Sequence, residues 1–306
     1  MTKIARVQFP PAPQRPSPAP LRVGTRAFEA GTHWFDLSTR VLVMGILNRT
    51  PDSFFDGGAY FDPEIALRHA EQLVADGADI IDIGGVKAGP GDHVTPQEEL
   101  ERVLPTVEAV VANFDVPVSI DSFRAEVSAA AVAAGAVIVN DISGLADPAM
   151  IDLAARNGTA IVICHIQGRP RIPNPTPRYN DLHAEMREYM HERLERCRQA
   201  GISASRIVLD HALDFGKTEA QSLELLAHTS DLAEFGLPVL VSASNKRYLG
   251  VLLGTDVNDR NEASLASAAF AIQRGARIVR VHDVLGTRRV ADTISALLEA
   301  ELELRE

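Results

Sequence analysis

From about residue 41 onward, short apolar segments rich in β-branched residues alternate with longer stretches rich in Ala, Leu and Glu. The apolar segments are expected to be strands, at 41–47, 80–84, 118–121, 137–141, 160–165, 207–210, 239–243 and 278–282. The stretches between them are expected to be helices, near 63–76, 96–112, 124–134, 147–157, 181–200, 219–235, 258–274 and 287–302. Strands that are apolar throughout are typical of a parallel sheet buried between helices. Eight strand–helix units in about 265 residues favour an α/β protein with a closed (β/α)8 TIM barrel, and an open doubly wound sheet is the alternative.

The first 22 residues differ from the rest of the chain. They contain six prolines and few side chains that could pack, which is typical of a flexible tail. The remaining residues, 23–306, are expected to form one barrel domain, because a single barrel uses most of that length.

Composition narrows the classes of partner. The formal net charge of −11 argues against a nucleic-acid partner, since such binding depends on Lys and Arg neutralising phosphates. The two cysteines, Cys164 and Cys197, do not form a disulfide scaffold and fit a reducing cytoplasm. Neither a signal-peptide pattern nor a membrane-spanning apolar run is found, so we expect a cytoplasmic protein without a membrane partner.

Polar residues gather where the expected strands end. They are Asn48, Asp82, Asp121, Asn140, Asp141, His165, Asp210, Lys246, Arg280 and His282. Each alone could be a helix cap or a loop-facing polar residue. In a barrel, however, all these ends form one rim, and together they indicate a site for a polar small molecule. Carboxylates and an amide can accept from the N–H groups of a flat nitrogen heterocycle, a lysine can donate to its carbonyl, and Arg280 with His282 suits an anion.

The segment 44–58, MGILNRTPDSFFDGG, closely resembles the first signature of the dihydropteroate synthase family. Further matches follow in order: GADIIDIGG at 77–85, VSIDS at 118–122, NDISG at 140–144, FGK at 215–217, Lys246 before Gly250, and RVHDV at 280–284. The resemblance therefore covers roughly residues 40–285 and implies a pterin-binding (β/α)8 barrel.

The resemblance also implies a reaction in folate biosynthesis. In that family a pterin carrying a CH2-pyrophosphate is joined to the amine of p-aminobenzoate, and Mg²⁺ assists departure of pyrophosphate. Carried over by position, Asn48 would bind the metal, and Asp56 on the loop after the first strand would cover the site. The pterin would be held by Asp121, Asn140, Asp210 and Lys246, and the pyrophosphate by Arg280 and His282. The implied catalytic residues are Asp56, Asp121, Lys246 and Arg280, and the implied assembly is a homodimer through the last helices.

The sequence departs from the family pattern mainly on the p-aminobenzoate side. Residues 86–91 read VKAGPG where the family has ESTRPG, so Gly89 stands in place of an arginine. Two usual glycines are Ala212 and Asp214, so any left-handed turn there is expected to be rebuilt, and Asn245 replaces an arginine. These changes resemble a divergent actinobacterial subgroup of paralogues whose synthase activity is in question. The alternatives are therefore a pterin-binding paralogue with weak or no synthase activity, serving another arylamine or a regulatory role, and, less favoured, a pterin-dependent methyltransferase.

Overall fold

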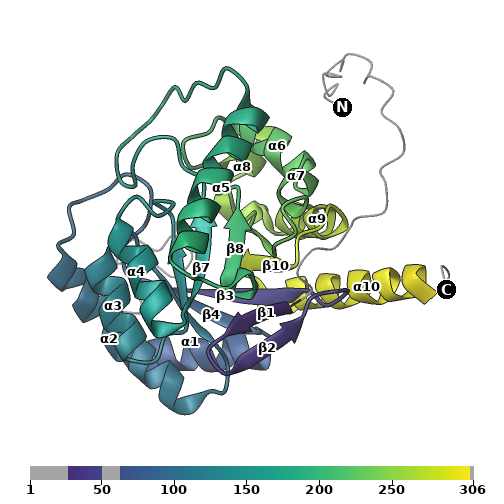
Figure 1. The fold of residues 1–306 in the computed structure, drawn as a ribbon. Coiled ribbons are helices and arrows are strands. Elements are labelled where there is room, and N and C mark those ends of the chain that lie inside the picture. Colours follow the sequence, from purple (N-terminus) through teal and green to yellow (C-terminus); the bar gives the residue numbers. More distant parts are fainter. Residues whose placement is uncertain (1–26, 50–62, 304–306) are drawn as a thin grey trace, which may run out of the picture.

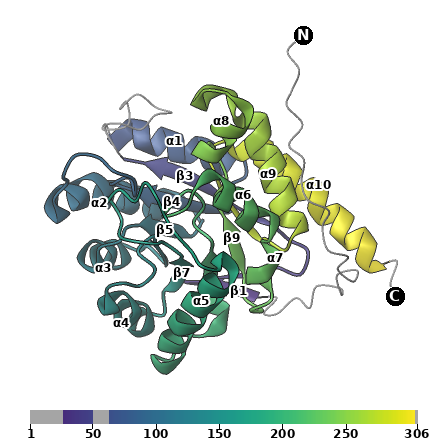
Figure 2. The ribbon, with the colours of Figure 1, turned by 90° about the horizontal axis from the view of Figure 1, so that it is seen from above.

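The computed structural model describes residues 27–49 and 63–303 of the chain. Asp56 and the proline-rich segment lie outside these described residues. The main sheet is a closed barrel of eight parallel strands in the order β10-β3-β4-β5-β6-β7-β8-β9. These strands are β3 (Leu42–Asn48), β4 (Ile80–Gly84), β5 (Val118–Asp121), β6 (Ile138–Asp141), β7 (Ala160–Cys164), β8 (Ile207–Asp210), β9 (Val239–Val241) and β10 (Ile278–Val281). The expected TIM barrel is confirmed, and the open doubly wound sheet is excluded (Figures 1 and 2).

Helices surround this barrel (Figure 2). They are α1 (Pro63–Ala75), α2 (Pro96–Asn113), α3 (Ala125–Ala133), α4 (Pro148–Asn157), α5 (Leu182–Gln199), α6 (Glu219–Ala227), α7 (Ser230–Ala233), α8 (Arg247–Leu253), α9 (Asn261–Gln273) and α10 (Val284–Glu303), with short 3-10 turns η2 (Ala204–Arg206) and η3 (Val257–Asp259). The prediction of a single helix over 219–235 is wrong, since the segment divides into α6 and α7 around His228 and Thr229. Helix α8 was not expected from the sequence.

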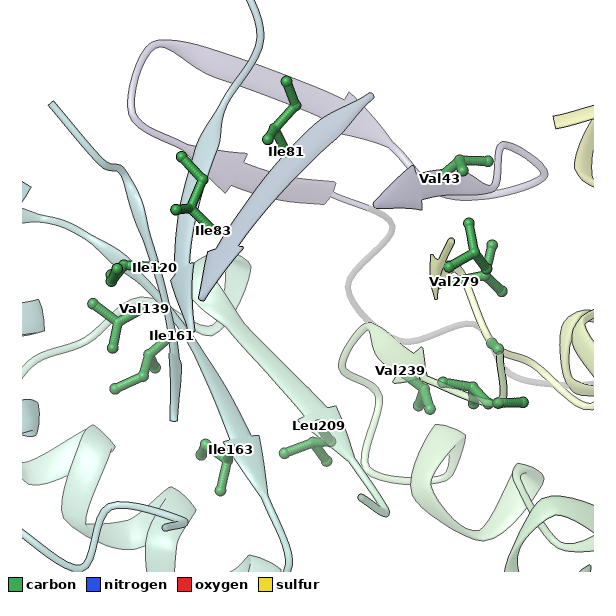
Figure 3. Packing of buried hydrophobic residues seen from close by; sticks show 14 of the residues in the cluster. Val43, Ile81, Ile83, Ile120, Val139, Ile161, Ile163, Leu209, Val239 and Val279 are labelled. Carbon is green, nitrogen blue, oxygen red and sulfur yellow. The ribbon is translucent and has the colours of Figure 1, made fainter. Parts of the chain in front are cut away.

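The buried apolar residues form two layers, because successive side chains of a strand face opposite sides of the sheet. Figure 3 shows outward-facing residues of the layer between barrel and helices, such as Ile81, Ile83, Ile120, Val139, Ile161 and Val279. The second layer fills the barrel interior and includes Leu42, Ile80, Ile138, Val208, Leu240 and Ile278. Each such aliphatic side chain stabilises the fold by about 1.5–3 kcal/mol when fully buried.

A hairpin that the sequence patterns did not reveal closes the N-terminal end of the barrel. It consists of β1 (Ala27–Ala30) and β2 (His33–Asp36). Phe28 and Phe35 from this hairpin, followed by Leu37, belong to the interior apolar layer. Since this end is sealed by apolar side chains, the polar residues of the interior are confined to the opposite rim.

Candidate active site

Four neighbouring strands place residues at or next to their C-terminal ends in one row across the rim. Asn48 pairs in register with Gly84, Gly84 with Asp121, and Asp121 with Asn140. Gly84 leaves space between its neighbours, because a Cβ added there would lie 3.5 Å from Asn48 Oδ1 and 3.7 Å from Asp121 Oδ2. An amide oxygen and a carboxylate oxygen therefore face one small space beside the backbone of β4.

Arg280 on β10 reaches across the barrel interior to two carboxylates. Its Nε donates to Asp82 Oδ2 at 2.6 Å, and its Nη2 donates to Asp121 Oδ2 at 2.8 Å. Asp82 is fully buried, and the side chain of Arg280 is 14% exposed. Burial alone would lower the pKa of Arg280, but Asp82 and Asp121 raise it further above its usual value. Arg280 thus remains a cation that balances one buried and one partly buried carboxylate.

Burial raises the pKa of Asp121 to about 7. Arg280 opposes this rise, whereas the charges of Asp82 and Glu99 add to it. Asp121 is consequently a carboxyl group that changes its charge near neutral pH at the centre of the rim.

The next part of the rim has donors and acceptors suited to a heterocycle. Asn140 Nδ2 lies 3.3 Å from Asp82 Oδ2, and the thiol of Cys164 lies between Asn140 Oδ1 at 3.7 Å and Asp210 Oδ2 at 3.9 Å. Asp210 Oδ1 accepts from the main-chain N–H of Ala212 at 2.8 Å. Burial raises the pKa of both Asp210 and Cys164. The arrangement offers an amide and a carboxyl in buried surroundings, with the Cys164 thiol between them.

Lys246 comes from the turn between β9 and α8, where it occupies the position before the first residue of the helix. Its Nζ lies 4.3 Å from the centroid of the Phe215 ring, which is a cation–π distance. Burial lowers the pKa of Lys246, and the nearby carboxylates of Asp214 and Asp210 oppose that effect. The ammonium group is therefore placed between an aromatic face and the acidic part of the rim.

His282 follows β10 and contacts Ser244. Its Nδ1 lies 2.9 Å from Ser244 Oγ, and its main-chain N–H donates to the same oxygen at 3.3 Å. Because Oγ already accepts from that N–H, its own hydrogen can go to Nδ1, which leaves the ring hydrogen on Nε2. Burial, Arg280 and Lys246 lower the pKa of His282 to about 3. His282 is thus a neutral hydrogen-bond donor at pH 7, and Arg280 supplies the charge of the expected anion-binding pair.

The β8–α6 loop keeps a left-handed backbone at the two positions where the usual glycines are absent. Ala212 has φ 52° and Asp214 has φ 72°, so the expectation that such a turn would be rebuilt is wrong. The Asp214 carboxylate accepts from the main-chain N–H of Arg247 at 2.6 Å. Lys217 is buried and its Nζ donates to the carbonyl of Phe215 at 2.9 Å, as well as to those of His165 and Ala212. These contacts hold the turn that places Phe215 beside Lys246.

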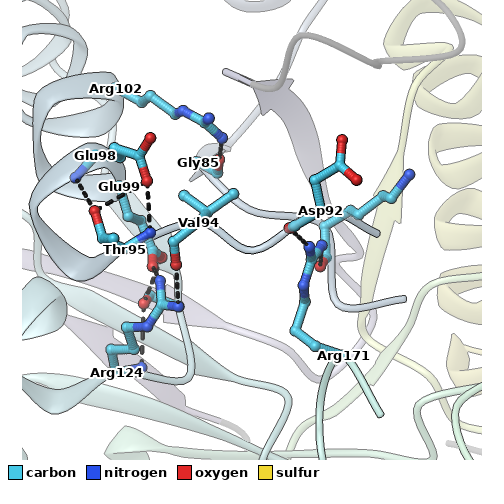
Figure 4. A network of polar contacts seen from close by, with 11 residues as sticks. Gly85, Asp92, Val94, Thr95, Glu98, Glu99, Arg102, Arg124 and Arg171 are labelled. Carbon is cyan, nitrogen blue, oxygen red and sulfur yellow. Dashed lines mark hydrogen bonds and ion pairs between the residues drawn. The ribbon is translucent and has the colours of Figure 1, made fainter. Parts of the chain in front are cut away.

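The β4–α2 loop, which contains the altered VKAGPG segment, is bound by arginines from three elements (Figure 4). Arg102 Nη1 donates to Gly85 O at 3.0 Å, and Arg124 Nη2 donates to Val94 O at 2.6 Å. Arg171, from the loop between β7 and α5, donates to carbonyls between these two points. The sequence did not reveal the role of these three arginines. Arg102 lies within a helix, and Arg124 and Arg171 are distant in sequence from the carbonyls that they bind.

A buried carboxylate supports this loop from below. Glu99 on α2 is fully buried, accepts from Ser122 Oγ at 2.7 Å, and pairs with Arg124. We expect Glu99→Gln to lower the free energy of unfolding by about 2–3 kcal/mol, since the substitution keeps the shape but removes the charge from a buried pair. Chemical denaturation would measure the loss, with Glu101→Gln, an exposed position on the same helix, as the control. Equal stability of the two variants would contradict the assigned pairing.

Comparison with known proteins agrees with the geometry. The family model described as "Pterin binding enzyme" matches residues 44–282. The dihydropteroate synthase of Escherichia coli K12 is 41% identical over 260 residues, covering 85% of this chain and 92% of that protein.

The chain belongs to the dihydropteroate synthase family. The crystal structure of the Yersinia pestis dihydropteroate synthase with a sulfonamide drug complex matches with a TM-score of 0.85 and 41% identity, covering 90% of this chain and 99% of that one. The expected family is thus confirmed.

A second kind of relative in the same family is equally similar. "Inactive dihydropteroate synthase 2" of Mycobacterium tuberculosis H37Rv is 42% identical over 265 residues, covering 84% of this chain and 83% of that protein. Overall identity to dihydropteroate synthases and to this inactive paralogue is nearly the same, so residues of the site must distinguish the two.

In the described ranges 27–49 and 63–303, no helix is long and apolar enough to cross a membrane.

Proposed function

We propose that this chain is a dihydropteroate synthase-type transferase. Its substrates would be 6-hydroxymethyl-dihydropterin pyrophosphate and p-aminobenzoate, and its products dihydropteroate and pyrophosphate. The observation that carries the proposal is the convergence of Asn140, Asp210 and Lys246 beside the pair of Arg280 with Asp121. A related barrel, the dihydropteroate synthase of Xanthomonas albilineans, has a structure in complex with 7,8-dihydropteroate.

The division of charge at the rim fits this reaction. The C–O bond between the pterin methylene and pyrophosphate breaks, and the pyrophosphate leaves with the electron pair. The lone pair of the arylamine then forms the new C–N bond, and the amine loses a proton. In this proposal Arg280 and the N–H of His282 face the leaving anion, whereas Asp121 stabilises the methylene as it becomes cationic. Asp56, outside the described residues, is proposed to assist from the loop after β3.

We propose that Mg²⁺ binds together with the pyrophosphate. The oxygen of Asn48 and that of Asp121 both face the space beside Gly84, and oxygen ligands suit this ion. Within the described parts of the chain, no cluster of three or more acidic, His or Cys side chains could hold a metal. Such a sparse site fits an ion that Asn48 holds while phosphate oxygens supply further ligands. When bound, Mg²⁺ would neutralise charge on the leaving pyrophosphate.

A second candidate function is pterin binding without condensation. The observation that favours it is the altered β4–α2 loop, in which Gly89 offers no side chain toward a second substrate. Similarity to the inactive mycobacterial paralogue points in the same direction. In this case the pterin side of the rim would be retained and another arylamine or a regulatory role would take the place of synthesis.

We also propose that the protein is a cytoplasmic homodimer. Large apolar side chains are exposed on the C-terminal helices, namely Leu252 and Leu253 on α8 and Leu297 on α10. Helix α10 extends well beyond the barrel (Figure 1), where a second subunit could pack against it.

Pyrophosphate release by the purified protein with Mg²⁺ and the pterin pyrophosphate, with and without p-aminobenzoate, tests these alternatives. Release that requires p-aminobenzoate would support the synthase.

We expect Lys246→Ala to lower kcat/KM by about 100-fold, because a preorganised cation at the pterin is lost. Arg274→Ala, an exposed cation at the end of α9, is the control and should retain the wild-type rate.

Calorimetric titration with the pterin pyrophosphate separates the remaining outcomes. Tight binding without release would contradict the synthase and support the non-condensing paralogue. Absence of binding would contradict both proposals.

A further inference from the structure

One arginine ties together two loops on the rim of the barrel. Arg171 lies between β7 and α5 and has a left-handed backbone with φ 69°. Its Nη1 donates to Lys87 O at 3.0 Å and Gly89 O at 3.2 Å, and its Nη2 donates to Asp92 O. Its main-chain N–H donates to Ala88 O at 2.8 Å. A single residue therefore binds four carbonyls of the β4–α2 loop.

The connection lies over the part of the rim that carries the candidate site. The two loops follow β4 and β7, and β5 and β6 lie between these strands in the barrel. β5 ends in Asp121, and Asn140 is the residue before the end of β6. Ala88 also packs against the apolar cluster inside the barrel, so the loop is folded inward. Figure 4 shows Arg171 reaching from one loop to the other.

The composition of the bound segment explains why it needs such a partner. Gly89 and Gly91 flank Pro90, and glycine loses more conformational freedom on ordering than any other residue. Ordering each residue costs about 1–2 kcal/mol, which hydrogen bonds from a planar guanidinium can offset. The backbone at Gly91 lies directly against that group, because a Cβ there would be 3.2 Å from both Nη1 and Nη2 of Arg171.

We propose that Arg171 is a positioning residue that holds the β4–α2 loop over the rim and so shapes the outer, arylamine side of the site. This inference rests on the proposed function. The inner side is formed by Asn140, Asp210 and Lys246, which come from strands and from the β9–α8 turn and not from this loop. A substrate bound outside the pterin would instead meet the loop. Arg171 thus influences the second substrate more than the first.

The test compares Arg171→Ala with Arg169→Ala, an exposed arginine in the same loop for which a structural role is not expected. In Arg171→Ala, amide hydrogen exchange across residues 86–92 should become faster. The KM for p-aminobenzoate should rise about tenfold, while kcat and the Kd of the pterin pyrophosphate stay within about twofold of wild type. Arg171→Lys should show faster exchange and a raised KM for p-aminobenzoate like the alanine variant, because lysine keeps the charge without the planar fork.

The outcomes separate this inference from the proposed function. Wild-type exchange across 86–92 in Arg171→Ala would overturn the inference whatever the activity. So would a fall in kcat or pterin affinity with no change in the KM for p-aminobenzoate. If the wild-type protein releases no pyrophosphate, the synthase proposal fails and exchange alone decides the role of Arg171, with faster exchange supporting it.

Discussion

Arg280→Ala is expected to lower kcat/KM for the pterin pyrophosphate by about 10²–10³-fold, which corresponds to about 3–4 kcal/mol of transition-state stabilisation. Two effects combine. The cation proposed to face the leaving pyrophosphate is removed, and Asp82 and Asp121 lose the guanidinium that balances them. We also expect the free energy of unfolding to fall by about 3 kcal/mol, because removal of one partner leaves the buried Asp82 carboxylate without compensation.

The double variant Asp82→Asn/Arg280→Ala separates these two effects. It should recover most of the lost stability, since one unpaired charge is removed, but it should remain slow because the cation is still absent. Urea denaturation and steady-state pyrophosphate release would measure the two quantities. Recovery of activity together with stability would contradict the proposed contact between Arg280 and the leaving group. The stability and the kcat/KM of Arg280→Lys should both lie between those of wild type and Arg280→Ala, because one ammonium cannot reach both carboxylates as the guanidinium does.

Asp121→Asn is expected to abolish a pH dependence that the wild-type protein shows below neutral pH. The folded pKa of Asp121 is raised from 3.8 to about 7, chiefly by burial. Below pH 7 the wild-type carboxyl becomes protonated and no longer stabilises a cationic methylene, so kcat/KM should fall with an apparent pKa of about 7. Asp121→Asn should be slower by about 100-fold at neutral pH and nearly independent of pH in this range.

Stability should depend on pH in the opposite sense to activity. Between pH 3.8 and about 7 the folded protein binds a proton at Asp121 that the unfolded chain has released. The stabilisation linked to that proton is complete below the unfolded pKa and is lost as pH rises through the folded pKa. The difference in unfolding free energy between wild type and Asp121→Asn should therefore change across this window. A difference that stays constant from about pH 4 to pH 8 would contradict the raised pKa.

Expected strands and helices agreed with the structure wherever a local pattern was strong. The bounds of β4, β5 and β8 are those expected, because apolar runs ending in a glycine or an acidic residue mark a buried strand unambiguously. The hairpin β1–β2 and helix α8 were missed, since each is short and carries no clear period of apolar residues. The split between α6 and α7 was missed because 219–235 contains neither Gly nor Pro within the segment.

The sequence by itself determined the barrel, the family and the set of polar residues at the strand ends. These follow from local periodicity and from motifs that keep their order along the chain, so no long-range contact is needed to see them. The binding and catalytic roles assigned to Asn48, Asp121, Asn140, Asp210, Lys246, Arg280 and His282 stay predictions, as does that of Asp56.

Only the tertiary structure decided how these residues influence one another. The pairing of Arg280 with Asp82 and Asp121 joins strands separated by 198 and 159 residues, and the neutrality of His282 depends on its burial beside that cation. The contact of Arg171 with the β4–α2 loop spans 79–84 residues. Charge state and loop order arise from desolvation and from contacts between distant segments, and neither is encoded in the local pattern of any one of them.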